Sequence, residues 1–398
     1  MGAWAAMPRV ALLLFLALLC CSWSAIASAV PPRTETIKLQ KDFNLAAKDY
    51  ESNAFVEQHD SIHISREAGK ESDVALVIPV AGTMKLTLYL TVWYVMSIFY
   101  NVFTKRTSQM IQLPWTLSAV QFGIGSAYAA PIWLSGLRKA PRLSFGDLDR
   151  LAPMTILNVL TLGFMTIGLG SGSVSFVNIV KATEPIFSCI FARTLLKEHL
   201  RSSVYATLIP IIAGVCLASL GELAFTFTAF GGAIGSSLTS ALRGILAKKS
   251  LNKPLGKNMT PENLCAVLNI TGFLVLAPIA LLLEGRQYIS SWKSASQGFA
   301  PSAIVMNAVL SGAALAVYYE ANYKFLGEVN AVTHAVANVM RRILMIATSV
   351  LVFGTKIGPL NMLGSVLACA GAFSYSVVKA GSAPKVKSSP VQQQCDKD

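Results

Sequence analysis

The sequence predicts an all-α polytopic membrane protein whose ten transmembrane helices form a five-plus-five inverted repeat. Of its 398 residues, 54% are hydrophobic and 13% are charged, whereas soluble domains have about 25% charged residues. Apolar stretches of about 20 residues, the length of helix that spans a bilayer, recur along the chain. The fourth and ninth of these stretches also resemble each other. This profile excludes a cytosolic enzyme.

The residues before the first predicted helix indicate a targeting segment followed by a polar arm. Residues 1–29 contain one arginine, Arg9, followed by the apolar run ALLLFLALLCC and the small residues SAIASA. This order is typical of a secretory signal peptide that is cut near Ala29. The composition of residues 30–83 predicts a disordered polar arm, and residues 381–398 predict a disordered C-terminal tail.

The membrane domain is predicted over residues 84–380. Its apolar stretches are expected to be helices, because lipid offers no partner to unpaired backbone groups. They cover residues 84–103, 113–135, 151–169, 173–195, 203–221, 224–246, 263–283, 301–325, 329–353 and 359–379. Five of them lie in residues 84–221 and five in residues 224–380.

Basic residues in the connecting loops indicate how the domain is oriented, because successive loops lie on opposite sides of the membrane. One side has thirteen, namely Arg138, Lys139, Arg142, Arg150, Lys197, Arg201, Lys248, Lys249, Lys253, Lys257, Lys379, Lys385 and Lys387. The other side has five, namely Lys105, Arg106, Arg286, Lys293 and Lys356. The bias places the polar arm and the C-terminus on the cytosol-like side. It also explains most of the net charge of +13 without a nucleic-acid partner.

The fourth and ninth stretches support an internal repeat. VSFVNIVKATEPIFSCIFARTLL has Lys181 in its middle, and VNAVTHAVANVMRRILMIATSVLVFG has Arg341 and Arg342 at the corresponding place. A short turn and a helix rich in small residues follow each of them. Because each half has five helices, the halves are predicted to have opposite orientations, which is how many transporters enclose a site near the midplane.

Charged residues inside the predicted helices indicate the kind of ligand. A basic residue at the centre of a membrane helix costs about 2.5–3.5 kcal/mol on insertion scales. The chain places Lys181, Arg341 and Arg342 within such helices and Arg243 near the end of the sixth, whereas the carboxylates are chiefly Glu184 and Glu320. This positive surplus favours an anion, and guanidinium groups match phosphate oxygens in a bidentate way.

Other interpretations of these charges remain open at this point. Lys181 and Glu184 are three residues apart and could form a structural pair on one helical face. Arg243 could extend toward the basic loop that begins at Lys248. Glu320 could neutralise one arginine of the adjacent pair, while Tyr318 and the histidine of the ninth helix, His334, could simply pack in the core.

No motif indicates catalysis or a cofactor. The run GLGSGS at residues 168–173 lacks the spacing of a nucleotide-binding loop and predicts a tight turn between the third and fourth helices. The seven cysteines and four histidines show no zinc spacing, and no Ser/His/Asp triad is evident. The sequence therefore predicts no enzyme, no metal site and no cofactor.

Several of these segments resemble the plastid phosphate translocators, antiporters of phosphorylated sugars and inorganic phosphate within the drug/metabolite transporter superfamily. The resemblance covers about residues 84–380 and rests on five motifs. They are WYVMSIFYNVFTKR, VSFVNIVKATEPIFS, GVCLASLGELAFTFTAF, ALRGILAKK and NAVTHAVANVMRRILMIATSVLVFGTKI. The resemblance implies ten helices in a five-plus-five inverted repeat, the same number that the apolar stretches predict.

The resemblance also implies a binding site for phosphate and for the rest of the substrate. Matching positions are Lys181, Arg243, Tyr318, Arg341 and Arg342. The chain departs from the family in two ways. Its adjacent pair is Arg-Arg where the family has Lys-Arg, and Leu162 and Met165 stand where plastid members have His and Thr. Thr161, Thr166 or Ser173 could supply the missing hydrogen bonds.

We therefore expect an antiporter that exchanges phosphorylated C3, C5 or C6 sugars or acids for inorganic phosphate by alternating access. The alternative is a nucleotide-sugar transporter of the ER or Golgi, which would also suit a signal peptide. A plastid-type carrier behind a secretory signal indicates a complex plastid that is reached through the secretory route. The organic substrate, the particular plastid membrane and the oligomeric state are left open by the sequence.

Overall fold

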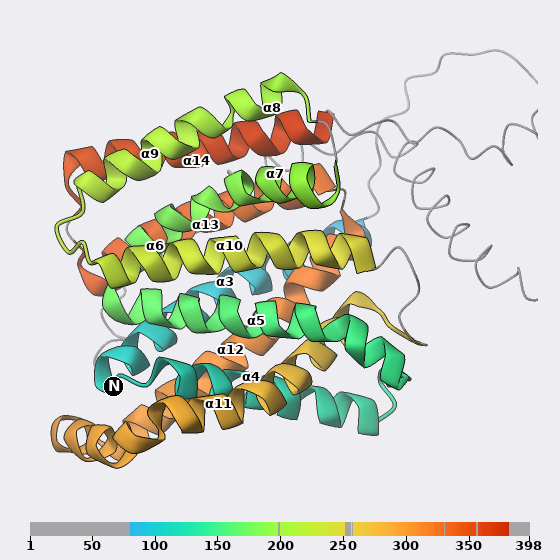
Figure 1. Cartoon of the computed structure of the whole chain (residues 1–398), viewed down its shortest axis with the longest axis vertical. Helices are drawn as coiled ribbons and strands as arrows, with labels where there is room; N and C mark the ends of the chain where they lie inside the picture. Colours follow the sequence, from blue (N-terminus) through green and yellow to red (C-terminus); the bar gives the residue numbers. More distant parts are fainter. Residues whose placement is uncertain are drawn as a thin grey trace, which may run out of the picture.

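The computed structural model describes residues 80–381, except residues 198–199, 251–255, 257, 330 and 356. The predicted signal peptide, all but the last residues of the polar arm, and the tail from residue 382 lie outside the described residues. The described part of the chain is helical, which confirms the all-α part of the predicted fold class (Figure 1).

Ten helical segments follow one another in the described residues, close to the predicted stretches. They are α3 (Val80–Met110), α4 (Pro114–Leu134), α5 (Phe145–Ser171), α6 (Val174–Val180) with the 3-10 turn η1 (Lys181–Thr183) and α7 (Glu184–Leu195), α8 (Ser202–Ala206) with α9 (Leu208–Leu220), α10 (Phe227–Ser250), α11 (Pro261–Gly298), α12 (Pro301–Glu328), α13 (Ala331–Phe353) and α14 (Pro359–Gly381). Two residues join α5 to α6, so the predicted tight turn is confirmed.

Eight of these segments are long and apolar enough to cross a membrane, which makes the chain a multi-pass membrane protein. The segments α4 and α10 are not among the eight. Both have polar side chains inside the bundle, such as Gln121 on α4 and Ser236 on α10, and these lower the hydropathy of a helix without exposing polar groups to lipid.

Three helices are clearly longer than the sequence predicts, of which α3 (Val80–Met110) extends beyond the predicted residues 84–103 at both ends. The start of α5 precedes residue 151 because Ser144 and Asp147 form a capping box, in which each side chain binds the backbone N–H of the other residue. The predicted end of the seventh helix at residue 283 is wrong, since α11 continues to Gly298. The carboxylate of Glu284 on α11 accepts hydrogen bonds from the backbone N–H groups of Trp115 (2.9 Å) and Thr116 (2.7 Å), which begin α4.

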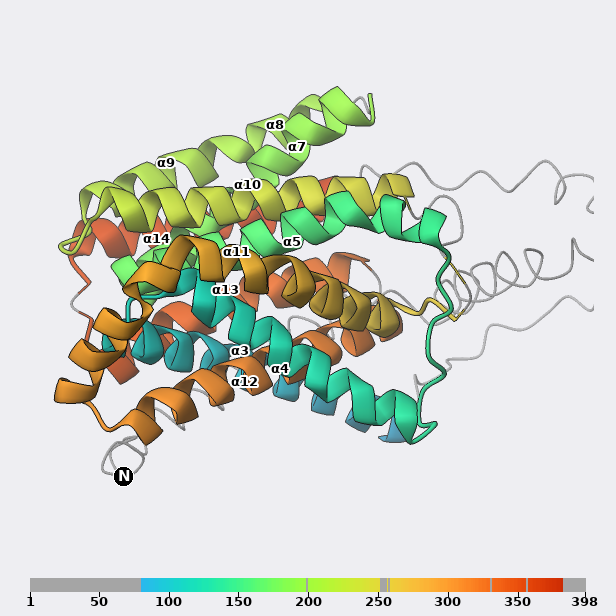
Figure 2. The same ribbon diagram turned by 60° about the horizontal axis from the view of Figure 1, so that its bottom comes forward.

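The helices pack in pairs that join the two parts of the sequence: α3 with α12, α4 with α11, α5 with α10, and α9 with α14 (Figures 1 and 2). The last pair is in backbone contact. A methyl group at Gly214 would lie 2.3 Å from the amide nitrogen of Ala368, and one at Gly364 would lie 2.3 Å from that of Ala218. Glycine is therefore required at both places, as in other close helix contacts within membranes.

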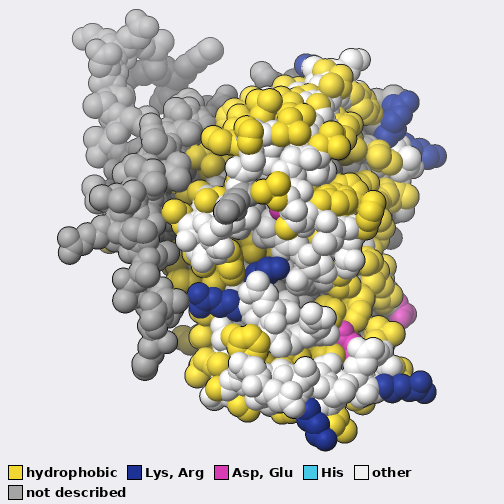
Figure 3. All heavy atoms as spheres, turned by 90° about the vertical axis from the view of Figure 1, so that its left-hand side faces the viewer, with side chains coloured by type: hydrophobic (Ala, Val, Ile, Leu, Met, Phe, Trp, Pro, Cys, Tyr) yellow, Lys and Arg dark blue, Asp and Glu magenta, His cyan; other side chains and the backbone are white. Residues whose placement is uncertain are grey.

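Polar contacts tie the helix ends together where α5 meets α6. The Lys105 ammonium donates to the carbonyl oxygen of Gly172 (2.8 Å). The Glu222 carboxylate accepts from the Ser173 hydroxyl (3.1 Å) and the Asn361 amide (2.6 Å). Figure 3 views the molecule from this end, where Lys and Arg side chains are few and lie apart between hydrophobic and uncharged areas.

Candidate functional site

Lys181 lies at a break in the fourth membrane segment. Pro185 has no N–H to donate to the carbonyl of Lys181, and its ring disfavours a regular helix across that turn. The chain instead forms the 3-10 turn η1, in which the Glu184 N–H binds the Lys181 carbonyl. Short 3-10 segments within helices often mark functional positions, and here the KATEP run creates one at the predicted binding lysine.

The Lys181 ammonium points toward α10. It donates a hydrogen bond to the Ser236 hydroxyl (2.8 Å), which in turn donates to the Thr161 carbonyl on α5 (3.1 Å). Lys181 also lies within electrostatic range of Arg243, Arg341 and Arg342. The fold therefore gathers the four predicted cations.

Glu184 binds partners on two other helices. Its Oε2 accepts from Nη2 of Arg342 on α13 (2.9 Å), and its Oε1 accepts from the hydroxyl of Ser240 on α10 (2.7 Å). The structural pair between Lys181 and Glu184 that the spacing allowed is therefore not formed as a salt bridge; Arg342 takes that place. The carboxylate still lies near Lys181 and stabilises it over a longer distance.

Arg341 and Arg342 face different parts of the site. Its Nε and Nη2 atoms donate to the Asn338 side-chain oxygen, at 3.2 and 3.0 Å. The guanidinium lies 5.6 Å from the ring centre of Tyr318 and 5.9 Å from that of Trp93. These aromatic faces attract a cation and hold the guanidinium in place. Tyr318 also stacks on Tyr100, with ring centres 6.3 Å apart.

Arg243 turns into the bundle beside Tyr319, Tyr323 and Glu184, so it does not extend toward the loop at Lys248. Its Nε is buried and has no hydrogen-bond partner among the described residues. The same is true of Nη1 of Arg342. Buried polar groups in proteins are almost always paired, so these two guanidinium N–H groups leave hydrogen-bonding capacity that an anion could fill.

The electrostatics of the site favour an anion. Four cations surround one carboxylate in the described cluster, so its formal charge is 4 − 1 = +3. The cations come from η1, α10 and α13, and their donors point in several directions, as the oxygens of a phosphoryl group require.

The two positions where plastid members have polar groups are apolar and packed. Leu162 lies in a hydrophobic cluster with Tyr100 and Phe122, and Met165 lies in another with Phe176. These side chains contribute to the core and offer no hydrogen bonds.

The three candidate substitutes for these positions already have partners. Thr161 donates to the Leu157 carbonyl (2.6 Å) and the Thr239 hydroxyl (2.9 Å). Thr166 is buried and accepts from Ser118 (2.9 Å), and Ser173 caps α6. Among these, Thr161 lies nearest the cations, through the link of its carbonyl to the hydroxyl that binds Lys181.

Glu320 does not neutralise the arginine pair, because it binds elsewhere. Its carboxylate forms ion pairs with Arg138 and with Lys324 (3.2 Å). His334 stacks on Trp93, with ring centres 5.1 Å apart, and shares a hydrogen bond with Asn322 (2.9 Å), as a packed core histidine does.

Sequence reasoning missed the polar side chains that support these cations. Ser236 and Ser240 stand four residues apart on α10, on the helical face that Arg243 continues three residues later. That spacing could have indicated a polar face inside the bundle. Asn338 precedes Arg341 by one helical turn, a spacing at which side chains on a helix interact.

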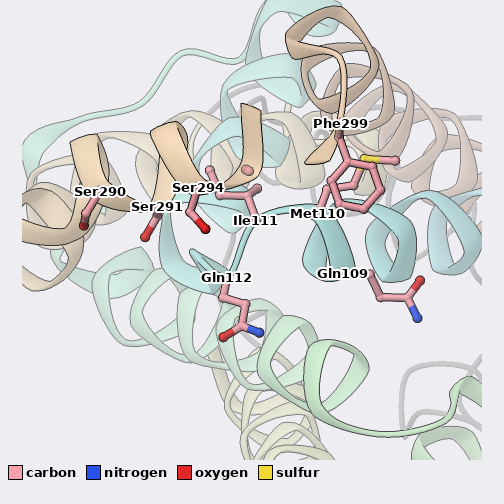
Figure 4. A pocket seen from close by; sticks show the side chains of 9 residues that line it. Gln109, Met110, Ile111, Gln112, Ser290, Ser291, Ser294 and Phe299 are labelled. Carbon is pink, nitrogen blue, oxygen red and sulfur yellow. The ribbon is translucent and has the colours of Figure 1, made fainter. Parts of the chain in front are cut away.

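A cavity of about 540 Å³ lies away from these cations, between the end of α3 and the last turns of α11 (Figure 4). Glutamine, serine and apolar side chains line it, and none of the predicted site residues is among them.

The described residues also contain no group of three or more His, Cys, Asp or Glu side chains that could hold a metal ion.

Paired helices from the two parts of the sequence, with a buried cationic cluster between them, define a membrane transporter for anions. Comparison with known families agrees. Residues 84–376 match the family described as the Triose-phosphate Transporter family, and the chain belongs to this family of transporters.

Three named relatives are 29–32% identical to this chain over the residues that align. A phosphoenolpyruvate/phosphate translocator 1 of Oryza sativa is 32% identical, over 79% of this chain and 75% of its own length. A triose phosphate/phosphate translocator of Brassica oleracea is 29% identical, over 89% and 90%. A glucose-6-phosphate/phosphate translocator 1 of Arabidopsis thaliana is 31% identical, over 75% and 76%. All three are described as chloroplastic.

Proposed function

We propose that this protein is an antiporter that exchanges a phosphorylated sugar or acid for inorganic phosphate across a plastid membrane by alternating access. One observation carries the proposal: the cationic cluster contains two buried guanidinium N–H groups, on Arg243 and Arg342, without partners among the described residues. A phosphoryl dianion would bind such donors and reduce the charge of the site from +3 to +1. Membership of the transporter family supports the same conclusion.

Each site residue has a proposed role. Lys181, Arg341 and Arg342 bind the phosphoryl group, and Arg243 and Tyr318 orient the rest of the substrate. Support for this division comes from the contacts of Arg243, which lies toward Tyr319 and Tyr323 on α12, whereas Arg342 lies toward Glu184. A strict exchange follows, because a carrier whose empty site has a charge of +3 changes its orientation at high cost.

The ten helical segments form a five-plus-five inverted repeat in this proposal, with α4 and α10 also crossing the membrane. The packing supports it. If the ten segments are counted along the chain, an inverted repeat exchanges each segment of the first five with the segment five positions later. This exchange converts the α3–α12 pair into the α10–α5 pair, and it maps the α4–α11 and α9–α14 pairs onto themselves. The reciprocal close contacts of Gly214 and Gly364, each with an alanine of the other helix, obey the same exchange.

Location and processing extend the proposal. Residues 1–29 would act as a signal peptide ahead of the polar arm, and the protein would reach a complex plastid by the secretory route. The chloroplast assignment in the names of the relatives supports a plastid. A fluorescent fusion imaged beside a plastid marker tests this, and a Golgi pattern would favour the nucleotide-sugar alternative.

The organic substrate belongs to the phosphorylated C3, C5 or C6 sugars or acids. The relatives are named for phosphoenolpyruvate, triose phosphate, glucose 6-phosphate and xylulose 5-phosphate, all together with phosphate. Because Leu162 and Met165 are apolar here, we expect a substrate preference that differs from members with polar groups at those positions. Competition among these four compounds for labelled phosphate uptake would identify the substrate.

The decisive experiment uses the purified full chain in proteoliposomes. Labelled phosphate uptake should be rapid into vesicles preloaded with phosphate and slow into unloaded vesicles. Equal uptake into both would refute the exchange mechanism. Competition by UDP-sugars, with none by sugar phosphates, would replace the proposal with nucleotide-sugar transport.

A further inference from the structure

Glu184 places a negative charge inside a site built for an anion. We propose that Glu184 is a resident counter-ion, which competes with the transported phosphate for Arg342 and thereby sets how tightly phosphate is held and how fast it is released. This inference rests on the function proposed above and concerns a positioning residue of the same site.

The contacts of Glu184 join the first part of the chain to two helices of the second part. Arg342 on α13 and Ser240 on α10 each donate to a different oxygen, at 2.9 and 2.7 Å. Only one edge of the Arg342 guanidinium is used, because Nη1 remains buried without a partner among the described residues. Arg342 can therefore hold Glu184 through one nitrogen and approach a second anion through the other.

Charge makes these two anions competitors. With Glu184 ionised, the cluster has a charge of +3 when empty and +1 with a phosphate dianion. Without the carboxylate charge, the values become +4 and +2. Electrostatic attraction for phosphate is therefore stronger, and return of the empty carrier more costly, when Glu184 is neutral. A moderate affinity suits a carrier, which must release its substrate on each side of the membrane.

Replacing Glu184 with glutamine separates the charge from the shape. The Glu184→Gln variant keeps the side-chain length and an oxygen acceptor for Arg342 or Ser240. We expect the KM for inorganic phosphate to fall roughly tenfold, the size of effect expected for one close charge pair, and the maximal exchange rate to fall with it. Loss of a merely structural contact would instead leave the KM unchanged or raise it.

A second measurement reports the charge of the empty carrier. The ratio of phosphate uptake into phosphate-loaded vesicles to uptake into unloaded vesicles should rise in Glu184→Gln, because the empty site has gained a positive charge. Ser240→Ala provides the matched control, since it removes a hydrogen bond from the same carboxylate but leaves the charge. Its KM should change less than that of Glu184→Gln, and its uptake ratio should stay near that of the wild type.

Glu320→Gln is the second control, because it neutralises a paired carboxylate outside the site. It should leave both the KM and the uptake ratio unchanged. A wild-type protein that fails to exchange phosphate would refute the proposed function itself. A wild-type protein that exchanges phosphate, with a Glu184→Gln variant whose KM is unchanged or raised, would refute only the counter-ion role.

If Glu184→Gln accumulates poorly in the membrane, Glu184→Asp decides the question, because it keeps the charge and shortens the side chain by one methylene. Its KM and uptake ratio should remain close to those of the wild type. A fall in KM in Glu184→Asp would overturn the inference, because affinity would then depend on the position of the carboxylate and not on its charge.

Discussion

Two carboxylates inside the bundle, Glu184 and Glu320, each bind an arginine from a distant part of the chain, yet their surroundings differ. The side chain of Glu184 is 28% exposed and that of Glu320 is 12% exposed, so Glu184 is not set apart by deeper burial of its carboxylate. Arg342 beside Glu184 is 9% exposed, whereas Arg138 beside Glu320 is 20% exposed.

The difference lies in the remaining donors. Around Glu320, Arg138 and Lys324 give a formal charge of 2 − 1 = +1, and no buried unpaired nitrogen of these cations is found in the described part of the chain. Around Glu184 the charge is +3, and two guanidinium nitrogens are buried without partners there. A charged residue in a membrane protein thus indicates a binding site chiefly when its hydrogen-bonding capacity is left unfilled.

The strongest test of this contrast replaces Arg342. Arg342→Ala removes the unpaired donor and leaves the Glu184 carboxylate without its guanidinium. Since hydrogen bonds to charged groups contribute about 1.5–3 kcal/mol each, loss of a bidentate contact should reduce phosphate exchange at least ~100-fold. Uptake of labelled phosphate, normalised to incorporated protein, measures this effect.

Arg138→Ala is the matched variant in the other region. It should retain at least about half of the exchange rate, a change of less than roughly 0.5 kcal/mol, because Glu320 keeps Lys324 as a partner and the pair lies outside the cationic cluster. Wild-type transport by Arg342→Ala, or complete loss in Arg138→Ala, would reverse the assignment of the two regions.

A smaller effect is expected from the support of Arg341. Asn338→Ala removes the acceptor for two guanidinium N–H groups of Arg341. The aromatic faces of Trp93 and Tyr318 then hold this guanidinium alone, and less firmly. Exchange should fall about tenfold, consistent with roughly 1.4 kcal/mol for a charged hydrogen bond. Asn307→Ala, which removes an amide that donates to the Ala303 carbonyl on its own helix, should have less effect, and an equal loss in both variants would argue for general destabilisation.

The support of Lys181 gives a weaker expectation. Ser236→Ala removes the hydroxyl that accepts from the ammonium, and the KM for phosphate should rise about threefold, since a single hydrogen bond contributes about 0.5–1.5 kcal/mol. The neighbouring Ser237→Ala is the control, because its buried hydroxyl donates to the Ala233 carbonyl on its own helix. Kinetics that do not separate these two serines would remove Ser236 from the site.

The least effect on transport is expected from Glu320→Gln, which should leave phosphate exchange at the wild-type rate because Glu320 lies outside the cationic cluster. The variant should nevertheless loosen the small cavity lined by Arg138, Glu320 and Cys265. In a protein whose sole cysteine is Cys265, a small thiol reagent should label this cysteine faster when Glu320 is replaced by glutamine than when Glu320 is present. Glu262→Gln, which alters another carboxylate of the same cavity, provides the comparison, and unchanged labelling would show that the ion pair does not close it.

Much of the fold and part of the site could be predicted from the sequence. Apolar stretches of about 20 residues gave the order of the helices, because burial in lipid is a local requirement of each segment. Lys181, Arg243, Arg341 and Arg342 could be singled out, because a charge in such a stretch is costly wherever the helix lies. The sequence left open how these charges pair with the carboxylates, and the structure pairs Glu184 with Arg342 and Glu320 with Arg138 and Lys324.

The sequence by itself determined that this is a helical membrane protein with a surplus of positive charge inside its helices. The predicted helix over residues 173–195 did not include the break at Lys181, although the proline that causes it acts on its own turn. Only the tertiary structure decided that Glu184 binds Arg342, 158 residues away, and that Ser236 binds Lys181. Spacing along one helix describes only neighbours on that helix. Partners across helices depend on which faces meet, and that arrangement is set by the packing of the whole bundle.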